Sequence, residues 1–95
     1  MELEAMANIG TEMARKLRAA GIHSAEELTA AGAEEAFLRL KVLCPQACLV
    51  HLYALEGAIE NVAFNSLDGA RKRELKAFSD RLRGTPGRKS IRERG

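Results

Sequence analysis

Residues that interrupt helices recur at short intervals along this chain of 95 residues. They lie at positions 8–10, Gly21, Gly32, Pro45, Asn65 with Ser66, and 84–87. The stretches between these breakers carry apolar residues at helical spacing. A chain of this length has room for one hydrophobic core of ordinary size. We therefore expect a single all-α domain, built as a compact bundle of about five helices.

The composition favours helices over sheets. Aromatic residues make up 4% of the chain and Trp is absent, so we expect a core of Leu, Ala, Met and Ile. The expected helices span residues 11–20, a short stretch after Ser24, 33–43, 47–62 and 68–83. Ser24 and Glu27 have the spacing of a capping box, in which each side chain bonds a free backbone N–H group of the first helical turn.

The spacing also predicts which side chains face the core. These are Ala33, Ala36, Phe37, Leu40 and Leu43 on the third helix, and Leu75, Phe78 and Leu82 on the fifth. The helix over residues 47–62 is apolar on most sides in its first two turns, which places it in the middle of the bundle. Gly57 inside this helix lowers the helix propensity by about 1 kcal/mol relative to Ala, so we expect close packing of a neighbouring backbone against it.

The net charge of +2 hides an uneven distribution along the chain. Residues 1–60 hold five basic and nine acidic side chains, a net of −4, whereas residues 61–95 hold ten basic and four acidic ones, a net of +6. Residues 84–95 contain one large apolar side chain, so we expect a flexible basic tail after a domain over residues 1–83. The acidic start lacks the pattern of a secretory signal, and no stretch is apolar enough to cross a membrane, so a cytoplasmic protein is expected.

The segment around Asn8 has the pattern of a helix-hairpin-helix turn, which exposes backbone N–H groups at a helix N-terminus. Such N–H groups, together with the helix dipole, favour a phosphate. The candidate donors are Asn8, Ile9, Gly10 and Thr11, and the candidate contacts to a nucleic-acid backbone are Arg15, Lys16 and Arg18. The alternative is a purely structural hairpin that is followed by a solvated basic helix face.

The order of motifs along the chain resembles a known family. The motifs are Asn8-Ile9-Gly10, Leu17 with Ala20-Gly21-Ile22, Ser24 with Glu27-Leu28, Gly32-Ala33, Ala36 with Leu40, and LYALEGAI over residues 52–59. Over about residues 3–83 they resemble the C-terminal domain of the TfoX/Sxy DNA-transformation (competence) regulators, as a stand-alone module. The resemblance implies a helix-hairpin-helix-like (SAM-like) N-terminal part, in proteins associated with switching on DNA-uptake genes. It implies no catalytic residues.

Metal and catalytic sites are not expected. Cys44, Cys48 and His51 have the chemistry of zinc ligands but not a convincing spacing, so we expect no metal and no other cofactor. Both cysteines are expected as free thiols, with Cys48 buried and Cys44 partly exposed. The pattern brings no nucleophile, base and orienting group together, so we expect neither an enzyme nor a small-molecule substrate.

These features favour a non-enzymatic binding module that contacts a DNA backbone through the Asn8 turn, in a role related to transcription. The last helix adds a secondary basic surface, which consists of Arg71, Lys72, Arg73 and Lys76 and which is either an extra contact to nucleic acid or a solvated face. The alternative is a module that binds a protein partner or itself through an apolar helix face and contacts no nucleic acid. The acidic first 60 residues and the low aromatic content favour this alternative.

Overall fold

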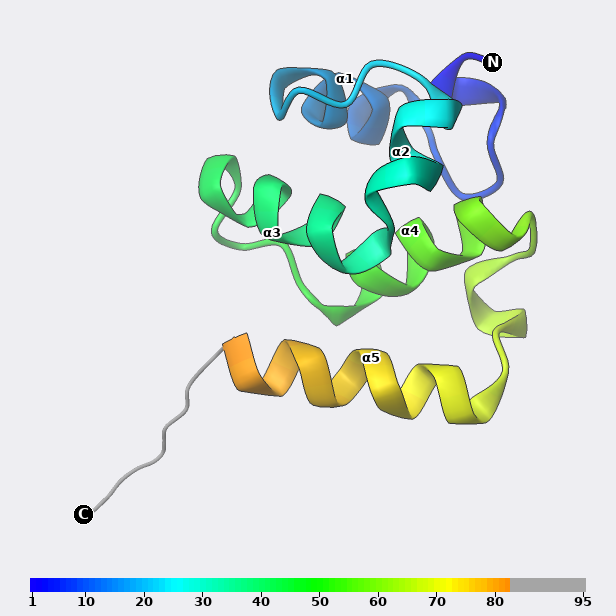
Figure 1. Cartoon of the computed structure of the whole chain (residues 1–95), viewed down its shortest axis with the longest axis vertical. Helices are drawn as coiled ribbons and strands as arrows, with labels where there is room; N and C mark the ends of the chain where they lie inside the picture. The colour runs from blue at the N-terminus through cyan, green and yellow to red at the C-terminus, as the bar shows by residue number, and fades with distance from the viewer. Residues whose placement is uncertain (83–95) are drawn as a thin grey trace.

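The computed structural model describes residues 1–82, which form helices and no strands (Figure 1). The α-helices are α1 (Thr11–Ala19), α2 (Ala25–Ala31), α3 (Ala33–Leu43), α4 (Leu49–Glu60) and α5 (Gly69–Leu82), and the 3-10 helices are η1 (Leu3–Ala5) and η2 (Phe64–Ser66). The expected all-α class and its five helices are confirmed. The tail expected over residues 84–95 lies outside the described residues. Within residues 1–82, no helix has the length and apolar character needed to cross a membrane.

The start of α2 is fixed by short-range hydrogen bonds. The Ser24 hydroxyl accepts a hydrogen bond from the Glu27 backbone N–H group at 3.1 Å, as the capping box predicts. The Glu27 carboxylate accepts a hydrogen bond from the N–H group of His23 at 2.7 Å, so the other half of the box is shifted by one residue. Gly32, with φ at +85°, then connects α2 directly to α3, because glycine reaches this conformation without steric cost.

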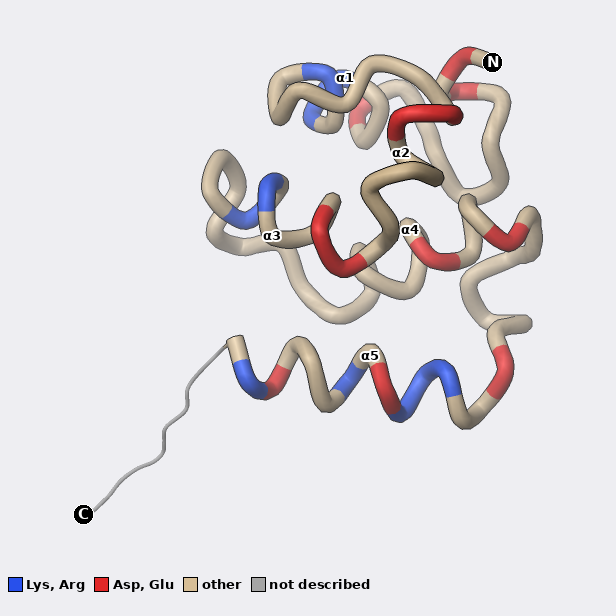
Figure 2. The backbone as a smooth tube through the Cα atoms, in the orientation of Figure 1, with Lys and Arg blue, Asp and Glu red and all other residues tan. Residues whose placement is uncertain are grey.

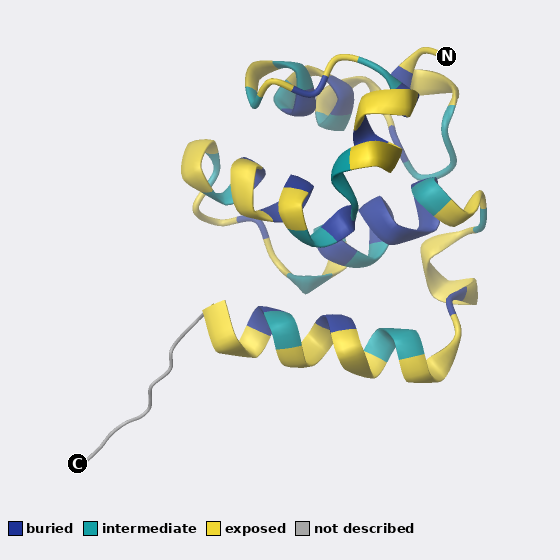
Figure 3. Ribbon diagram, viewed as in Figure 1, coloured by how far each residue is buried: buried dark blue, intermediate teal, exposed yellow. Residues whose placement is uncertain are grey.

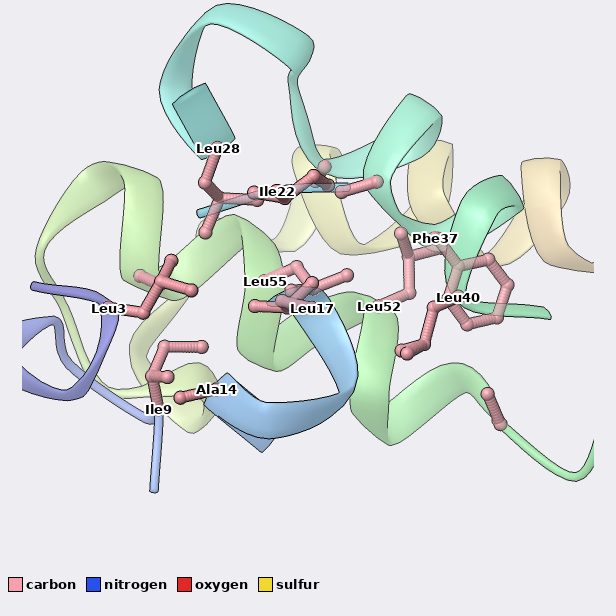
Figure 4. Packing of buried hydrophobic residues seen from close by; sticks show 14 of the residues in the cluster. Leu3, Ile9, Ala14, Leu17, Ile22, Leu28, Phe37, Leu40, Leu52 and Leu55 are labelled. Atoms are coloured by element: carbon pink, nitrogen blue, oxygen red, sulfur yellow. The ribbon is translucent and has the colours of Figure 1, made fainter. Parts of the chain in front are cut away.

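Helix α4 lies at the centre of the fold, where it contacts α2, α3, α5 and η2. Its Leu52 and Leu55 side chains are fully buried, in one cluster with Leu17 of α1 and with Phe37 and Leu40 of α3 (Figure 4). Burying one such leucine stabilises the folded state by about 1.5–3 kcal/mol relative to leaving it exposed. The central position that the sequence predicts for this helix is confirmed.

Two leucines that we expected in the core lie at the surface instead. Leu43 is 54% exposed and Leu82 is 40% exposed, and each occupies the last position of its helix. Leu43 precedes the turn at which the chain leaves α3 and returns as α4. The last turn of α3 is mostly exposed (Figure 3). Leu82 ends α5, which packs on α4 through the buried Leu75. Helical spacing predicts the direction in which these two leucine side chains point. It does not predict whether another helix reaches far enough to bury them.

The N-terminal segment is tied to the start of α2. The Met1 carbonyl accepts a hydrogen bond from the Ala25 N–H group at 2.9 Å, and the Met1 amino group binds both carboxylate oxygens of Glu26, at 2.8 and 3.0 Å. A hollow of about 570 Å³ lies between this segment, α2 and the end of α4. Its lining contains one carboxylate, that of Glu26, which is the group that the Met1 amino group binds.

Candidate functional site at the Asn8 turn

Asn8 fixes the candidate turn by internal hydrogen bonds. Its backbone has φ at +68°, the left-handed conformation that Asn tolerates better than most residues. The side-chain nitrogen donates to the carbonyl of Val62 at 2.9 Å, and more weakly to that of Ala54 at 3.4 Å. The side-chain oxygen accepts from the N–H group of Phe64 at 3.1 Å. The side-chain amide therefore joins the turn to the end of α4 and the start of η2.

Gly57 makes room for the Asn8 side chain. A Cβ atom at position 57 would lie 2.4 Å from the Asn8 side-chain nitrogen and 2.7 Å from the Val62 carbonyl oxygen. Both distances are shorter than real Cβ contacts, so a side chain at this position would displace the Asn8 amide or the backbone at Val62. The close approach that we expected at Gly57 is confirmed, and its partners are the Asn8 side chain and the Val62 backbone.

The N-terminus of α1 has backbone N–H groups without a partner inside the helix. Ile9 is buried and donates its N–H group to the Met6 carbonyl at 3.3 Å, so this candidate donor is used within the fold. Gly10 is the N-cap of α1 and provides no side-chain cap. The first backbone bond of the helix runs from Ala14 to the Gly10 carbonyl, so the N–H groups of the first turn, from Thr11 onward, have no intrahelical partner.

Three cations follow the turn on α1 (Figure 2). Two of them are paired with carboxylates. Arg18 donates to both oxygens of Glu4, at 2.7 and 2.8 Å, and to Glu2 at 3.3 Å. The hydrogen bond from Arg18 lowers the pKa of Glu4 from 4.5 to about 2. Arg15 pairs with Glu12, three residues earlier on α1.

Lys16 lies on the same helix and is half-buried, and it has no hydrogen-bond or ion-pair partner among residues 1–82. The three candidate contacts to nucleic acid therefore differ in whether a carboxylate of the chain already binds them. Arg15 and Arg18 are neutralised by local carboxylates, whereas the ammonium group of Lys16 remains available.

Arg71 of the secondary basic surface is also paired. Its guanidinium group binds Glu56 at 3.1 Å, Glu74 at 3.0 Å and Glu34 at 3.8 Å, which connects α5 to α4 and α3. Burial has the largest single effect on Glu56 and disfavours its charged form. The hydrogen bonds from Arg71 and Glu60 and the positive charge of Arg71 together outweigh burial, so the pKa of Glu56 lies below its ordinary value. Glu60 shares a hydrogen bond with Glu56, which raises the pKa of Glu60.

The other cations of this surface differ in their surroundings. Lys72 lies over the Tyr53 ring, 5.9 Å from its centre, and Lys76 pairs with Asp80 at 3.0 Å. Arg73 is exposed and has no ion-pair partner in the described part of the chain. Residues 1–82 together hold ten basic and twelve acidic side chains, a net of −2. The positive net charge of the whole chain therefore comes from residues 83–95.

Residues 1–79 match the family of the TfoX C-terminal domain. The chain belongs to this family. The family that the motifs resemble is therefore confirmed. A comparison with curated proteins finds no match to the chain.

Two crystal structures of Listeria monocytogenes proteins are similar to this TfoX C-terminal domain. One is an uncharacterized protein in a triclinic form, with 40% sequence identity and a TM-score of 0.87, covering 88% of this chain and 96% of that chain. The other is a protein of unknown function in a tetragonal form, with 41% identity and a TM-score of 0.83, covering 85% of this chain and 99% of that chain.

The cysteine and histidine residues of this TfoX C-terminal domain act at the ends of helices. Cys48 is the N-cap of α4, and its N–H group donates to the His51 Nδ1 atom at 3.0 Å. Both cysteines are free, and no group of three potential metal ligands occurs among the described residues. Cys44 is partly exposed, as expected, but Cys48 is exposed rather than buried. The reason is that α4 begins at Leu49, whereas we expected this helix to begin at residue 47. Cys48 therefore lies before the apolar turns of the helix.

An exposed apolar face on α3 is the surface that the sequence pattern did not reveal. Val42 is 80% exposed and Leu38 is 38% exposed, one helical turn apart on the side opposite the buried Phe37 and Leu40. The exposed Leu43 adjoins them at the end of the helix. We call Leu38, Val42 and Leu43 the α3 outer face. The available signal was the spacing of four between Leu38 and Val42 away from the core side.

A hollow of about 290 Å³ lies beside the α3 outer face. Its lining comes from two helix ends and consists of Ala19, Ala20, Arg39, Val42 and Leu43. All of these side chains except Arg39 are apolar. The hollow thus continues the apolar surface from α3 toward the end of α1.

Proposed function

We propose that this member of the TfoX C-terminal domain family is a non-enzymatic binding module whose helical body contacts protein through the α3 outer face. The observation that carries this proposal is the exposure of Leu38, Val42 and Leu43 next to an apolar hollow. Adjoining exposed apolar side chains, unlike single scattered ones, mark binding surfaces. The resemblance to competence regulators supports a role related to transcription and competence. In this proposal the role is cytoplasmic and is exerted through a protein partner.

Contact of the Asn8 turn with a DNA backbone is the second candidate. The uncapped first turn of α1 and the unpaired Lys16 support it, because free N–H groups and a cation suit a phosphate. The ion pairs of Arg15 and Arg18 weaken it, since each guanidinium group would have to exchange a carboxylate for a phosphate. The net charge of −2 over residues 1–82 also opposes the approach of a polyanion.

Two hollows of the described chain hold few charged groups. The hollow at the N-terminal segment contains the single carboxylate of Glu26, held by the Met1 amino group, and the hollow beside α3 contains the single guanidinium group of Arg39. The otherwise apolar lining beside α3 supports a binding role for that surface.

A titration of labelled duplex DNA with the full chain, at low and at high salt, separates the two candidates. If protein binding is the function, exchanging Arg15 and Lys16 for Glu leaves any affinity for DNA unchanged. Exchanging Lys72 and Arg73 for Glu is the matched control, because it changes the charge equally on another helix. Salt-sensitive binding that only the first pair of substitutions abolishes would establish the Asn8 turn as a nucleic-acid site and contradict the proposal.

Retention of protein from a nuclease-treated extract, on the immobilised full chain, tests the α3 outer face directly. We expect the same protein to be retained by the wild-type chain and by Ala70→Lys, and to be lost with Val42→Lys. Both substitutions place a lysine at an exposed helical position, so only the surface differs. Equal retention by all three chains would show that the α3 outer face is not the binding surface.

A further inference from the structure

We propose that the solvent side of α5, which carries Arg73 and Arg81, binds the phosphate backbone of duplex DNA together with the cations of residues 83–95. The contact is to phosphates and does not read the base sequence. This surface shares no residue with the α3 outer face, so it adds a second binding activity to the proposed function.

The charges of the chain divide at the start of α5. Residues 1–68 hold five basic and ten acidic side chains, a net of −5, whereas residues 69–95 hold ten basic and three acidic ones, a net of +7. Five of these ten cations lie on α5, and the other five lie in residues 83–95 (Figure 2 shows those on α5). The last part of the chain therefore attracts a polyanion, although the part before it repels one.

The arginines of α5 differ from the other arginines of the described chain. Arg15, Arg18 and Arg39 lie outside α5, and each of them binds a carboxylate. Arg73 and Arg81 are exposed and have no ion-pair partner among residues 1–82. These two guanidinium groups can thus bind a phosphate without first giving up a carboxylate, which is the exchange that Arg15 and Arg18 would require.

Helical spacing brings these two arginines to the side of α5 that faces solvent. The buried side of α5 is marked by Leu75 and Ser79. At about 3.6 residues per turn, positions 73, 77 and 81 follow one another along the opposite side, each about 6 Å from the next. The middle position is Ala77, which is exposed and small, so a phosphate backbone can approach both guanidinium groups.

The surroundings of α5 favour a duplex over a single strand or a membrane. Lys72 lies over the Tyr53 ring and Arg81 over the Phe78 ring, each 5.9 Å from the ring centre. The chain's own cations thus cover the rings on which unstacked bases would otherwise stack. The apolar side of α5 packs on α4 through Leu75, so it is not free to enter a lipid surface. The exposed cations that remain suit the phosphates of a duplex.

Titration of the full chain with a labelled DNA duplex of mixed sequence, over a range of salt concentrations, tests the inference. The affinity is expected to fall as salt rises, because each phosphate contact adds about 0.9 to the slope of log K against log salt. The double variant Arg73→Gln with Arg81→Gln should make this slope shallower by about 1.8. The double variant Arg88→Gln with Lys89→Gln, which leaves α5 unchanged, should also make the slope shallower.

The double variant Arg15→Gln with Lys16→Gln is the comparison, because it removes two positive charges from α1. It should change the slope little, and thermal unfolding shows whether each variant keeps its fold. Absence of binding at low salt would overturn the inference. An equal decrease with the α1 pair and the α5 pair would also overturn it, because net charge alone would then set the affinity. A decrease with the α1 pair alone would assign the binding to the Asn8 turn instead.

Two further probes identify the class of polyanion. Single-stranded DNA of the same length and vesicles that contain anionic lipid should both bind more weakly than the duplex. Tighter binding to either probe would overturn the assignment to a duplex backbone. Retention of protein through Val42 is measured separately after nuclease treatment, so the DNA contact and the proposed function can each fail without the other.

Discussion

Asn8 holds three parts of the chain together with one side-chain amide. The turn before α1, the end of α4 at Val62 and the start of η2 at Phe64 all meet at this group. The sequence places at this position an asparagine, a residue that adopts positive φ more readily than most residues. It did not indicate that the side chain bonds groups more than fifty residues away, since local spacing carries no information about such contacts. The residue that we proposed as a phosphate donor is therefore first a structural one.

Asn8→Gly isolates the contribution of these hydrogen bonds, and Asn61→Gly is its matched control. Both asparagines have positive φ, at +68° and +61°, so glycine is compatible with either backbone. We expect Asn8→Gly to lower the free energy of unfolding by about 2 kcal/mol, because it leaves a carbonyl and an N–H group without their partner. Asn61 has no side-chain hydrogen bond within residues 1–82, so Asn61→Gly should cost less than about 1 kcal/mol. Urea unfolding measures both, and equal losses would contradict the role given to Asn8.

At the scale of elements, the spacing of apolar residues predicted which helices form. It did not predict how much of each helix the neighbouring helices bury. Leu40 and Leu43 lie one turn apart on α3, yet only Leu40 is buried. The difference arises because Leu43 ends the helix beside an open hollow, a property of the packed bundle and not of the helix itself. Val42 is exposed for another reason, since it lies on the side of α3 opposite the buried Phe37 and Leu40. The spacing of Leu38 and Val42 carried a signal for this surface, but spacing alone does not show that these side chains stay exposed in the packed bundle.

Gly57→Ala tests the packing between α4 and the Asn8 turn. Alanine has the higher helix propensity, by about 1 kcal/mol, but its methyl group would meet the Asn8 amide and the Val62 carbonyl. Overpacking of this kind costs about 1–3 kcal/mol, so we expect a net loss of stability. Gly69→Ala is the control, because a Cβ atom there approaches only the Arg73 side chain, at 3.6 Å, which is an ordinary contact.

Thermal unfolding should show a lower midpoint for Gly57→Ala and an unchanged or slightly higher one for Gly69→Ala. Combining Gly57→Ala with Asn8→Gly should cost less than the sum of the two, because the glycine removes one of the two colliding groups. A stabilised Gly57→Ala chain would mean that helix propensity outweighs this close approach.

For the molecule as a whole, charge counts along the sequence could not show which charges neutralise one another. Arg18 pairs with Glu4, and Arg71 with Glu56, each across more than ten positions. These pairs lower the pKa of Glu4 and of Glu56, whereas the pKa of Glu60 is raised. A lowered pKa stabilises the folded state above the ordinary value of 4.5, and this stabilisation is lost as the pH falls. The raised pKa of Glu60 acts in the opposite direction, because it lowers the stability of the folded state above the ordinary value.

The pair of Arg18 and Glu4 therefore predicts a loss of stability in acid. As the pH falls from about 4.5 toward 2, Glu4 takes up a proton sooner in the unfolded chain than in the folded one, so the free energy of unfolding should decrease. Arg18→Gln removes the hydrogen-bond donor, so it should lower stability at neutral pH and flatten the decrease. Lys16→Gln removes the same charge without breaking an ion pair, and it removes only the smallest of the effects that lower the pKa of Glu12, so its profile should stay closer to the slope of the wild type. Urea midpoints at neutral pH and at about pH 3 measure these slopes. Equal slopes for all three chains would show that this pair does not control the acid stability of the fold.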